Sequence, residues 1–153
     1  VDRLFTVVGE SKAYFGEKDF QQTLVVSDLA RAIGYPKVIV CPTVREASGL
    51  ALSSRNSLLK AEQENEVIKI YQALLAAKKF WQQGERNPEP LRRAMNDILE
   101  ASTLVMEYAA IRDPENWSAS PPYSHLNQAQ ALIAARMGNV RLIDNMRLDN
   151  ETP

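Results

Sequence analysis

The sequence has 153 residues, of which 45% are hydrophobic and 24% are charged, and its formal net charge is −1. These values are ordinary for a globular protein with one domain or two small ones. The chain lacks the basic surplus that drives general nucleic-acid binding, so we expect no nucleic-acid partner. No apolar run approaches the roughly 18–20 residues of a membrane-spanning helix, and no signal peptide is visible. We therefore expect no membrane partner either.

The chain contains one cysteine, Cys41, and one histidine, His125. A single cysteine excludes an internal disulfide and a thiolate metal cluster, and a single histidine excludes a multi-histidine metal site. We therefore expect no protein-bound metal. One thiol in an apolar run is typical of a buried cysteine in a reducing compartment, which favours a cytoplasmic protein. The chain begins at Val1 rather than at a methionine, so we expect a fragment or a processed product.

The first part of the chain has the pattern of a helix end, a strand, a helix and a second strand. Residues 1–8 (VDRLFTVV) have the pattern of a helix end, and KAYF (12–15) is a short apolar strand. From Gly16 the spacing becomes helical up to Gly34, and KVIVC (37–41) is an apolar run of strand length. Strand–helix–strand is the unit of a parallel sheet.

Strands without polar alternation require cover on both faces, which one helix cannot supply. We therefore interpret the first part of the chain, up to about Pro42, as the last piece of a larger sheet domain, with most of that domain absent from this chain.

The second part, residues 44–153, has the pattern of an α+β domain with a three-stranded antiparallel sheet. Helical spacing extends from Ala61 to Gln83, and a further helix starts near Pro88 and Pro90, since proline favours the first turn. The pattern predicts strands near residues 103–112, 129–137 and 140–148, and a loop over 113–127. The dipeptide Gly138–Asn139 is a strong signal for a two-residue hairpin.

The motif GEKD (16–19) follows the first predicted strand and opens a helix. Open α/β sheets bind ligands at this position, and the N–H groups and partial positive charge of a helix start favour phosphate. Lys18 adds an ammonium group, and Asp19 has the acceptors that a ribose hydroxyl needs. The alternative is that Asp19 only caps the helix.

The motif SSRN (53–56) is flanked by apolar residues. Ser53 and Ser54 offer hydroxyl donors, and the guanidinium of Arg55 matches the geometry of phosphate oxygens. The alternative is a plain turn in which serine and asparagine bond to the nearby backbone. We expect the flanking leucines to hold the segment against a core; they are Leu50, Leu52, Leu58 and Leu59. Because both motifs follow parallel strands, we expect them at one edge of the sheet.

Three stretches together resemble a known family: YFGEKDFQQ (14–22), PTVREASGLALSSRN (42–56) and ARMGNVRLIDN (135–145). Their order and spacing are similar to the C-terminal half of the pantothenate synthetases, also called pantoate–β-alanine ligases. The resemblance implies an ATP-dependent ligase related to class I aminoacyl-tRNA synthetases. It implies that residues 1–43 are the C-terminal remnant of a nucleotide-binding, Rossmann-like domain and that residues 44–153 are a C-terminal α+β lid domain. Such an enzyme makes pantoyl-adenylate from ATP and pantoate, and β-alanine then attacks the adenylate to give pantothenate and AMP. Mg²⁺ would be bound mainly by the ATP phosphates, and the full-length enzyme would be a homodimer.

The resemblance also implies roles for individual residues. Lys18 would contact the ATP phosphates and Asp19 the ribose, while SSRN would correspond to a flexible loop that closes over the triphosphate. Gln22 would bind pantoate, although by itself it is an ordinary exposed helix residue. Val44 would meet the adenine through its backbone. The ATP-binding residues implied in this way are Gly16, Glu17, Lys18, Asp19, Val44, Leu52, Ser53, Ser54 and Arg55, and those implied for catalysis are Lys18, Ser53, Ser54 and Arg55.

The sequence departs from the family pattern at two places. A histidine-containing nucleotide motif of the HxGH type, which lies near the family's N-terminus, is absent here, so we expect this chain alone to be inactive. Ser48 stands where the family commonly has an acidic residue. Two other functions stay open: an interaction or regulatory domain that kept the fold without catalysis, and another nucleotidyltransferase.

Overall fold

The computed structural model describes residues 1–118 and 125–150, which form two compact units, Val1–Val44 and Arg45–Pro153. We call them unit 1 and unit 2. Unit 1 contains a two-stranded parallel sheet and unit 2 a three-stranded antiparallel sheet, which confirms the predicted fold class. None of the helices in the described residues is long and apolar enough to cross a membrane.

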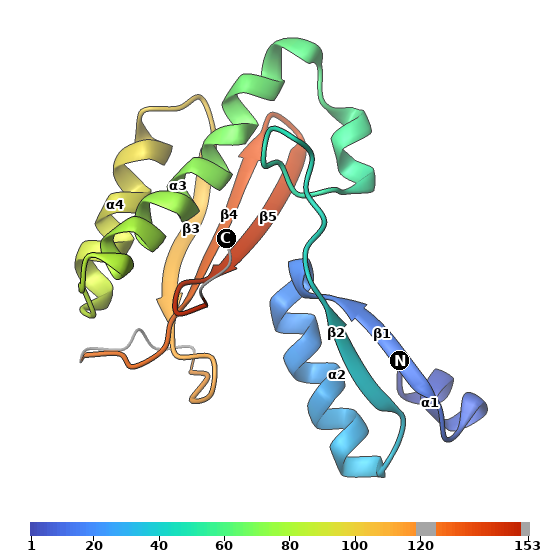
Figure 1. Ribbon diagram of the computed structural model, residues 1–153. Coiled ribbons are helices and arrows are strands. Elements are labelled where there is room, and N and C mark those ends of the chain that lie inside the picture. The colour runs from blue at the N-terminus through green and yellow to red at the C-terminus, as the bar shows by residue number, and fades with distance from the viewer. Residues whose placement is uncertain (119–124, 151–153) are drawn as a thin grey trace. The chain divides into compact units, whose positions relative to one another are not determined.

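Unit 1 is a strand–helix–strand arrangement preceded by a short helix (Figure 1). Strands β1 and β2 pair in parallel from Lys12↔Lys37 to Gly16↔Cys41. The glycine at position 34 ends the connecting helix in the left-handed conformation, with φ of 87°. The elements are α1 (Asp2–Val8), β1 (Lys12–Gly16), the 3-10 helix η1 (Glu17–Asp19), α2 (Phe20–Ile33) and β2 (Lys37–Cys41).

One face of the unit 1 sheet packs against helices. Phe15 and Val38 pack against a small core formed by Phe5 of α1 together with Val26 and Ala30 of α2. Because side chains alternate along a strand, the residues on either side of Phe15 in β1 and of Val38 in β2 point to the opposite face.

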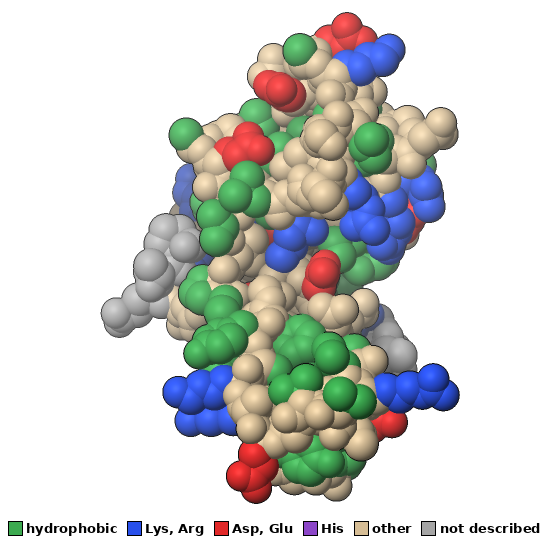
Figure 2. Space-filling view, turned by 90° about the vertical axis from the view of Figure 1, so that its right-hand side faces the viewer, with side chains coloured by type: hydrophobic (Ala, Val, Ile, Leu, Met, Phe, Trp, Pro, Cys, Tyr) green, Lys and Arg blue, Asp and Glu red, His purple; other side chains and the backbone are tan. Residues whose placement is uncertain are grey.

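The opposite face of this sheet is more accessible. Tyr14 is 65% exposed, and Cys41 is half-buried rather than buried, so the prediction of a buried cysteine is wrong. The apolar strands indicated that this part of the chain could not cover both faces of its sheet, and the core of unit 1 involves one face. Figure 2 shows hydrophobic side chains on the surface of this unit.

Unit 2 consists of two long helices and a sheet in the order β3-β4-β5 (Figure 1). Both pairings are antiparallel, and Met137 pairs with Val140 across the turn at Gly138–Asn139, which confirms the predicted hairpin. The elements are η2 (Ser54–Leu58), η3 (Ala61–Gln63), α3 (Glu64–Gln82), α4 (Pro88–Glu100), β3 (Val105–Arg112), β4 (Gln130–Met137) and β5 (Val140–Arg147). The loop predicted for residues 113–127 is observed at 113–118 and 125–127; residues 119–124 lie outside the described residues.

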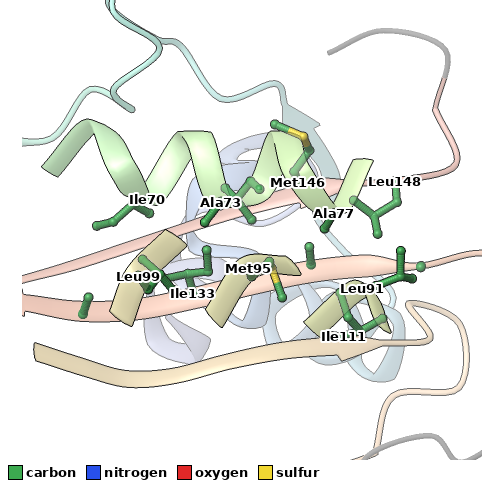
Figure 3. Packing of buried hydrophobic residues seen from close by; sticks show 14 of the residues in the cluster. Ile70, Ala73, Ala77, Leu91, Met95, Leu99, Ile111, Ile133, Met146 and Leu148 are labelled. Atoms are coloured by element: carbon green, nitrogen blue, oxygen red, sulfur yellow. The ribbon is translucent and has the colours of Figure 1, made fainter. Parts of the chain in front are cut away.

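The core of unit 2 lies between the two helices and one face of the sheet. Figure 3 shows Ile70 and Ala73 of α3 and Met95 of α4 directed at the strands, with Ile133 of the central strand between them. Burying each large apolar side chain contributes about 1.5–3 kcal/mol, so this core makes unit 2 the rigid support for its loops.

Candidate functional site

The GEKD motif lies at the end of β1 and forms η1, directly before α2. Gly16 has an extended backbone, with φ of −75°, and among the described residues a Cβ at this position would meet no atom within 4 Å. Neither backbone strain nor packing within the described part of the chain therefore explains a glycine here. A ligand that approaches the backbone closely would explain it, since glycine leaves the N–H and C=O groups uncovered.

The charged residues of this motif point to a mixed electrostatic environment. Asp19 is at the N-cap position of α2, but its exposed side chain makes no capping hydrogen bond, so the structure does not support the simple capping interpretation. Glu17 and Lys18 are half-buried. Two carboxylates at a helix start offset part of its positive potential, so phosphate binding there would depend on Lys18 and the backbone N–H groups. Gln22 is exposed in the first turn of α2.

The SSRN motif begins the 3-10 helix η2 in unit 2. The Ser53 hydroxyl accepts a hydrogen bond from the Arg55 backbone N–H at 3.2 Å, and the Asn56 amide donates to the Ala51 carbonyl at 3.1 Å. These are the local bonds that the plain-turn interpretation requires. They leave the Ser53 proton free to donate and do not involve the guanidinium of Arg55. Arg55 and Ser54 are exposed, and within the described residues neither side chain has a hydrogen bond or an ion pair.

The apolar anchoring of this motif differs from the prediction. Leu50 and Leu59 pack against the core of unit 2 and Ala51 is 4% exposed, as expected of anchors. Leu52 and Leu58, however, are 50% and 66% exposed, so their predicted anchoring role is wrong. In an irregular segment no helical or strand period decides which of several neighbouring leucines faces inward.

The remaining predicted residue, Val44, is 66% exposed and is the last residue of unit 1. The GEKD group, Gln22 and Val44 thus belong to unit 1, while residues 52–55 belong to unit 2. The GEKD group and Gln22 are neighbours along the chain, and so are residues 52–55, whereas Val44 is distant in sequence from the GEKD group. Their assembly into one nucleotide site stays a prediction.

The structure adds a polar cluster that the sequence analysis did not identify. Arg45 forms a bidentate ion pair with Asp144 of β5, with Nη1–Oδ2 at 2.6 Å and Nη2–Oδ1 at 3.0 Å. Its guanidinium also stacks on the ring of Tyr71, 4.7 Å from the centroid. One pattern in the sequence indicates this pair. Asp144 shares every second position of the strand with Leu142 and Met146, so all three side chains point to the face that packs against the core. A carboxylate on that face requires a partner.

The described residues contain no group of three His, Cys, Asp or Glu side chains placed to hold a metal ion.

Ser48 is exposed in the turn before the SSRN motif, where its hydroxyl accepts a hydrogen bond of 3.4 Å from the Leu50 N–H. This local role leaves Ser48 without a part in the charge cluster around Arg45.

Comparison with known proteins decides the family. The sequence profile of the pantoate-beta-alanine ligase family matches residues 1–147. The chain belongs to this family. It is 39% identical to the pantothenate synthetase of Dehalococcoides mccartyi over 97% of this chain and 55% of that protein. With the enzyme of Herpetosiphon aurantiacus it shares 41% identity over 95% of this chain and 53% of the relative.

Solved structures agree with this assignment. The pantothenate synthetase of Thermus thermophilus matches with a TM-score of 0.87 and 40% identity, over 95% of this chain and 52% of that one. A pantoate-beta-alanine ligase from Francisella tularensis, solved in complex with beta-gamma ATP and beta-alanine, matches with a TM-score of 0.65 and 30% identity, over 97% of this chain and 48% of the other. The chain therefore spans about half the length of the relatives it matches.

Proposed function

We propose that this chain supplies the C-terminal half of a pantothenate synthetase. The reaction is the ATP-dependent condensation of pantoate with β-alanine through a pantoyl-adenylate, which yields pantothenate, AMP and pyrophosphate. Family membership over residues 1–147 is the observation that carries the proposal. In this proposal residues 1–43 complete a nucleotide-binding domain, and residues 44–153 form a lid over the nucleotide.

The exposed guanidinium of Arg55 supports a role in phosphate binding. Attack of the pantoate carboxylate on the α-phosphate builds negative charge on phosphate oxygens and on the departing pyrophosphate. A guanidinium that has no partner within the described residues can form two charge-assisted hydrogen bonds to those oxygens without first breaking an ion pair. Ser53 and Ser54 have hydroxyl donors beside it. We assign to these three residues the stabilisation of the charge that develops in adenylation.

The proposal also assigns roles to residues of unit 1. We assign Lys18 to the phosphates, Asp19 to the ribose and Gln22 to pantoate, with Gly16, Glu17 and Val44 in contact with ATP. The open space at Gly16 supports close approach of a ligand to the backbone there. Leu52 is exposed next to Ser53, so its side chain is accessible to ATP.

We propose that Mg²⁺ reaches the site bound to its substrate, ATP, rather than to the protein. Mg²⁺ would be held by the ATP phosphates and retain several waters, which requires no protein cluster of carboxylates. It would supply further charge neutralisation on the phosphates. We further propose that the complete enzyme is a cytoplasmic homodimer with only small-molecule substrates.

The proposal is tested by restoring the missing half. The N-terminal half of the Thermus thermophilus enzyme is joined in front of Val1, and pyrophosphate release and pantothenate are measured with ATP, pantoate and β-alanine. We expect activity from this fusion and none from the 153-residue chain alone. Circular dichroism and a melting curve establish that both proteins are folded.

Arg55→Ala in the fusion tests the phosphate contact. Charge-assisted hydrogen bonds contribute about 1.5–3 kcal/mol each, and each 1.36 kcal/mol corresponds to about tenfold in rate, so adenylation should slow roughly 10- to 100-fold or more. Arg93→Ala, which removes another exposed arginine on α4, is the matched control and should leave the rate unchanged. A folded fusion without pyrophosphate release would favour the non-catalytic interaction domain instead.

A further inference from the structure

Arg45 is held by an unusually complete set of partners for a loop residue. Besides the two bonds to Asp144, Nη1 donates to the Gly49 carbonyl at 3.1 Å and Nη2 to the Asn145 carbonyl at 3.2 Å. The side chain of Arg45 is 18% exposed and that of Asp144 is 5% exposed. The ion pair is therefore shielded from water and salt far better than a surface pair.

These contacts fix a short hairpin that leads into the SSRN motif. Arg45 and Ala51 form an isolated antiparallel bridge, and the Glu46 N–H donates to the Leu50 carbonyl at 2.9 Å. The turn between them places Gly49 directly against the ring of Tyr71. The loop is thus held to β5 by the ion pair and to α3 by the Tyr71 ring.

The SSRN motif is hydrogen-bonded to this hairpin through Asn56, and η2 also lies close to β5. Asn56 donates to the Ala51 carbonyl, the residue bridged to Arg45, and its amide also reaches the Glu46 carboxylate at 3.4 Å. The side chain of Arg55 has no hydrogen-bond or ion-pair partner in the described residues. The location of its guanidinium therefore depends on the loop backbone, which Asn56 connects to the hairpin that Arg45 anchors.

We propose that Arg45 and Asp144 are a positioning pair, which holds the SSRN motif in the geometry that presents Arg55 to phosphate. The phosphate contact rests on the function proposed above; the anchoring does not. Arg45 is unsuited to bind phosphate itself, because Asp144 neutralises its charge and four hydrogen bonds already occupy its guanidinium. The two arginines of this loop thus have different roles: Arg45 holds the loop in place, and Arg55 binds the ligand.

Anchoring is tested on the 153-residue chain by amide hydrogen exchange. Asp144→Asn keeps the shape of the side chain but removes its charge, and Arg45→Lys keeps the charge but loses the fork. We expect the amides of residues 46–59 to exchange about tenfold faster or more in both variants, because the loop opens locally. The amides of α3, α4 and β4 should keep their rates.

Glu107→Gln is the matched control for this measurement. Glu107 also pairs with two arginines of the same sheet, Arg136 and Arg141, both at 2.7 Å, but none of these residues belongs to the loop. It should leave exchange at residues 46–59 unchanged. Unaltered loop exchange in Asp144→Asn and Arg45→Lys overturns the proposal, as does an equal increase throughout unit 2, which would signify a general loss of stability.

The link to phosphate is tested by a double-mutant cycle in the fusion enzyme. Arg45→Lys and Arg55→Ala should each lower kcat for pyrophosphate release, and the double variant should be slowed by less than the product of the two single effects. Once the guanidinium is gone, displacing the loop can remove only the contacts of Ser53 and Ser54. Multiplying effects would contradict positioning through Arg55. If the fusion releases no pyrophosphate, the proposed function fails, while the exchange measurement still decides the anchoring.

Discussion

Replacing Gly49 with alanine probes the close contact between the loop and α3. Gly49 has φ of +90°, a region that side chains rarely adopt, and a Cβ there would come within 2.9 Å of Tyr71 Cγ and closer still to Cδ1 and Cε1. The left-handed backbone costs about 1–2 kcal/mol for a residue with a Cβ. Forcing a ring out of a packed position costs typically about 1–3 kcal/mol more. We therefore expect Gly49→Ala to destabilise unit 2 by about 2–5 kcal/mol.

The matched control is Gly84→Ala, which separates the two contributions. Gly84 follows α3 with φ of +96°, and a Cβ there would meet nothing within 4 Å. It should cost only the backbone contribution of about 1–2 kcal/mol. Urea denaturation of both variants gives the difference, and amide exchange at residues 46–51 detects a loop that opens without global unfolding. Equal effects of the two substitutions on both measurements would refute the steric argument.

Three further predictions follow from particular side chains. Leu52→Ala should change the free energy of unfolding by no more than about 0.5 kcal/mol, whereas Leu74→Ala, at a fully buried position, should cost about 2–5 kcal/mol in the same denaturant titration. The hydrogen bond from Lys69, and after it that from the Thr103 N–H, lowers the pKa of Glu66 to about 2. The stability that Glu66 contributes is therefore complete above its unfolded pKa of 4.5 and is lost as the pH falls toward 2, so Glu66→Gln should flatten the acid limb of a stability–pH profile. Finally, Gly138→Val should weaken the β4–β5 hairpin, because φ of 57° there suits glycine, and proton NMR would then show weaker cross-strand contacts.

The regular elements could be predicted because their signals are local. Apolar spacing identified α2 and α3, and the dipeptide at Gly138–Asn139 identified the turn between β4 and β5. The differences lie at element ends: the predicted helix from Ala61 begins with a 3-10 turn, and β3 starts at Val105 rather than near residue 103. Such ends depend on individual hydrogen bonds that composition does not encode.

The irregular loop could not be predicted to the same degree. Its exposed residues Ser54 and Arg55 were identified from their chemistry, but the choice of anchors was partly wrong, since Leu50 and Leu59 face the core and Leu52 and Leu58 do not. The main anchor, Arg45, pairs with a carboxylate 99 positions later in the chain. No window of local sequence contains both partners, and only the register of β5 brings them together.

Under the proposed function, in which the SSRN loop binds phosphate, Arg45 and Arg55 have different and complementary roles. A guanidinium that is to bind phosphate must keep its donors free, and free donors leave the side chain without a fixed position. A guanidinium that is to fix a position must use its donors, and it then has no net charge to offer. One residue cannot do both, because each hydrogen bond that orders it removes a donor from the ligand. In the proposed enzyme, separating the two roles would let Arg45 retain the loop geometry between ligand encounters, while the exposed Arg55 would stay solvated until a phosphate replaced its water.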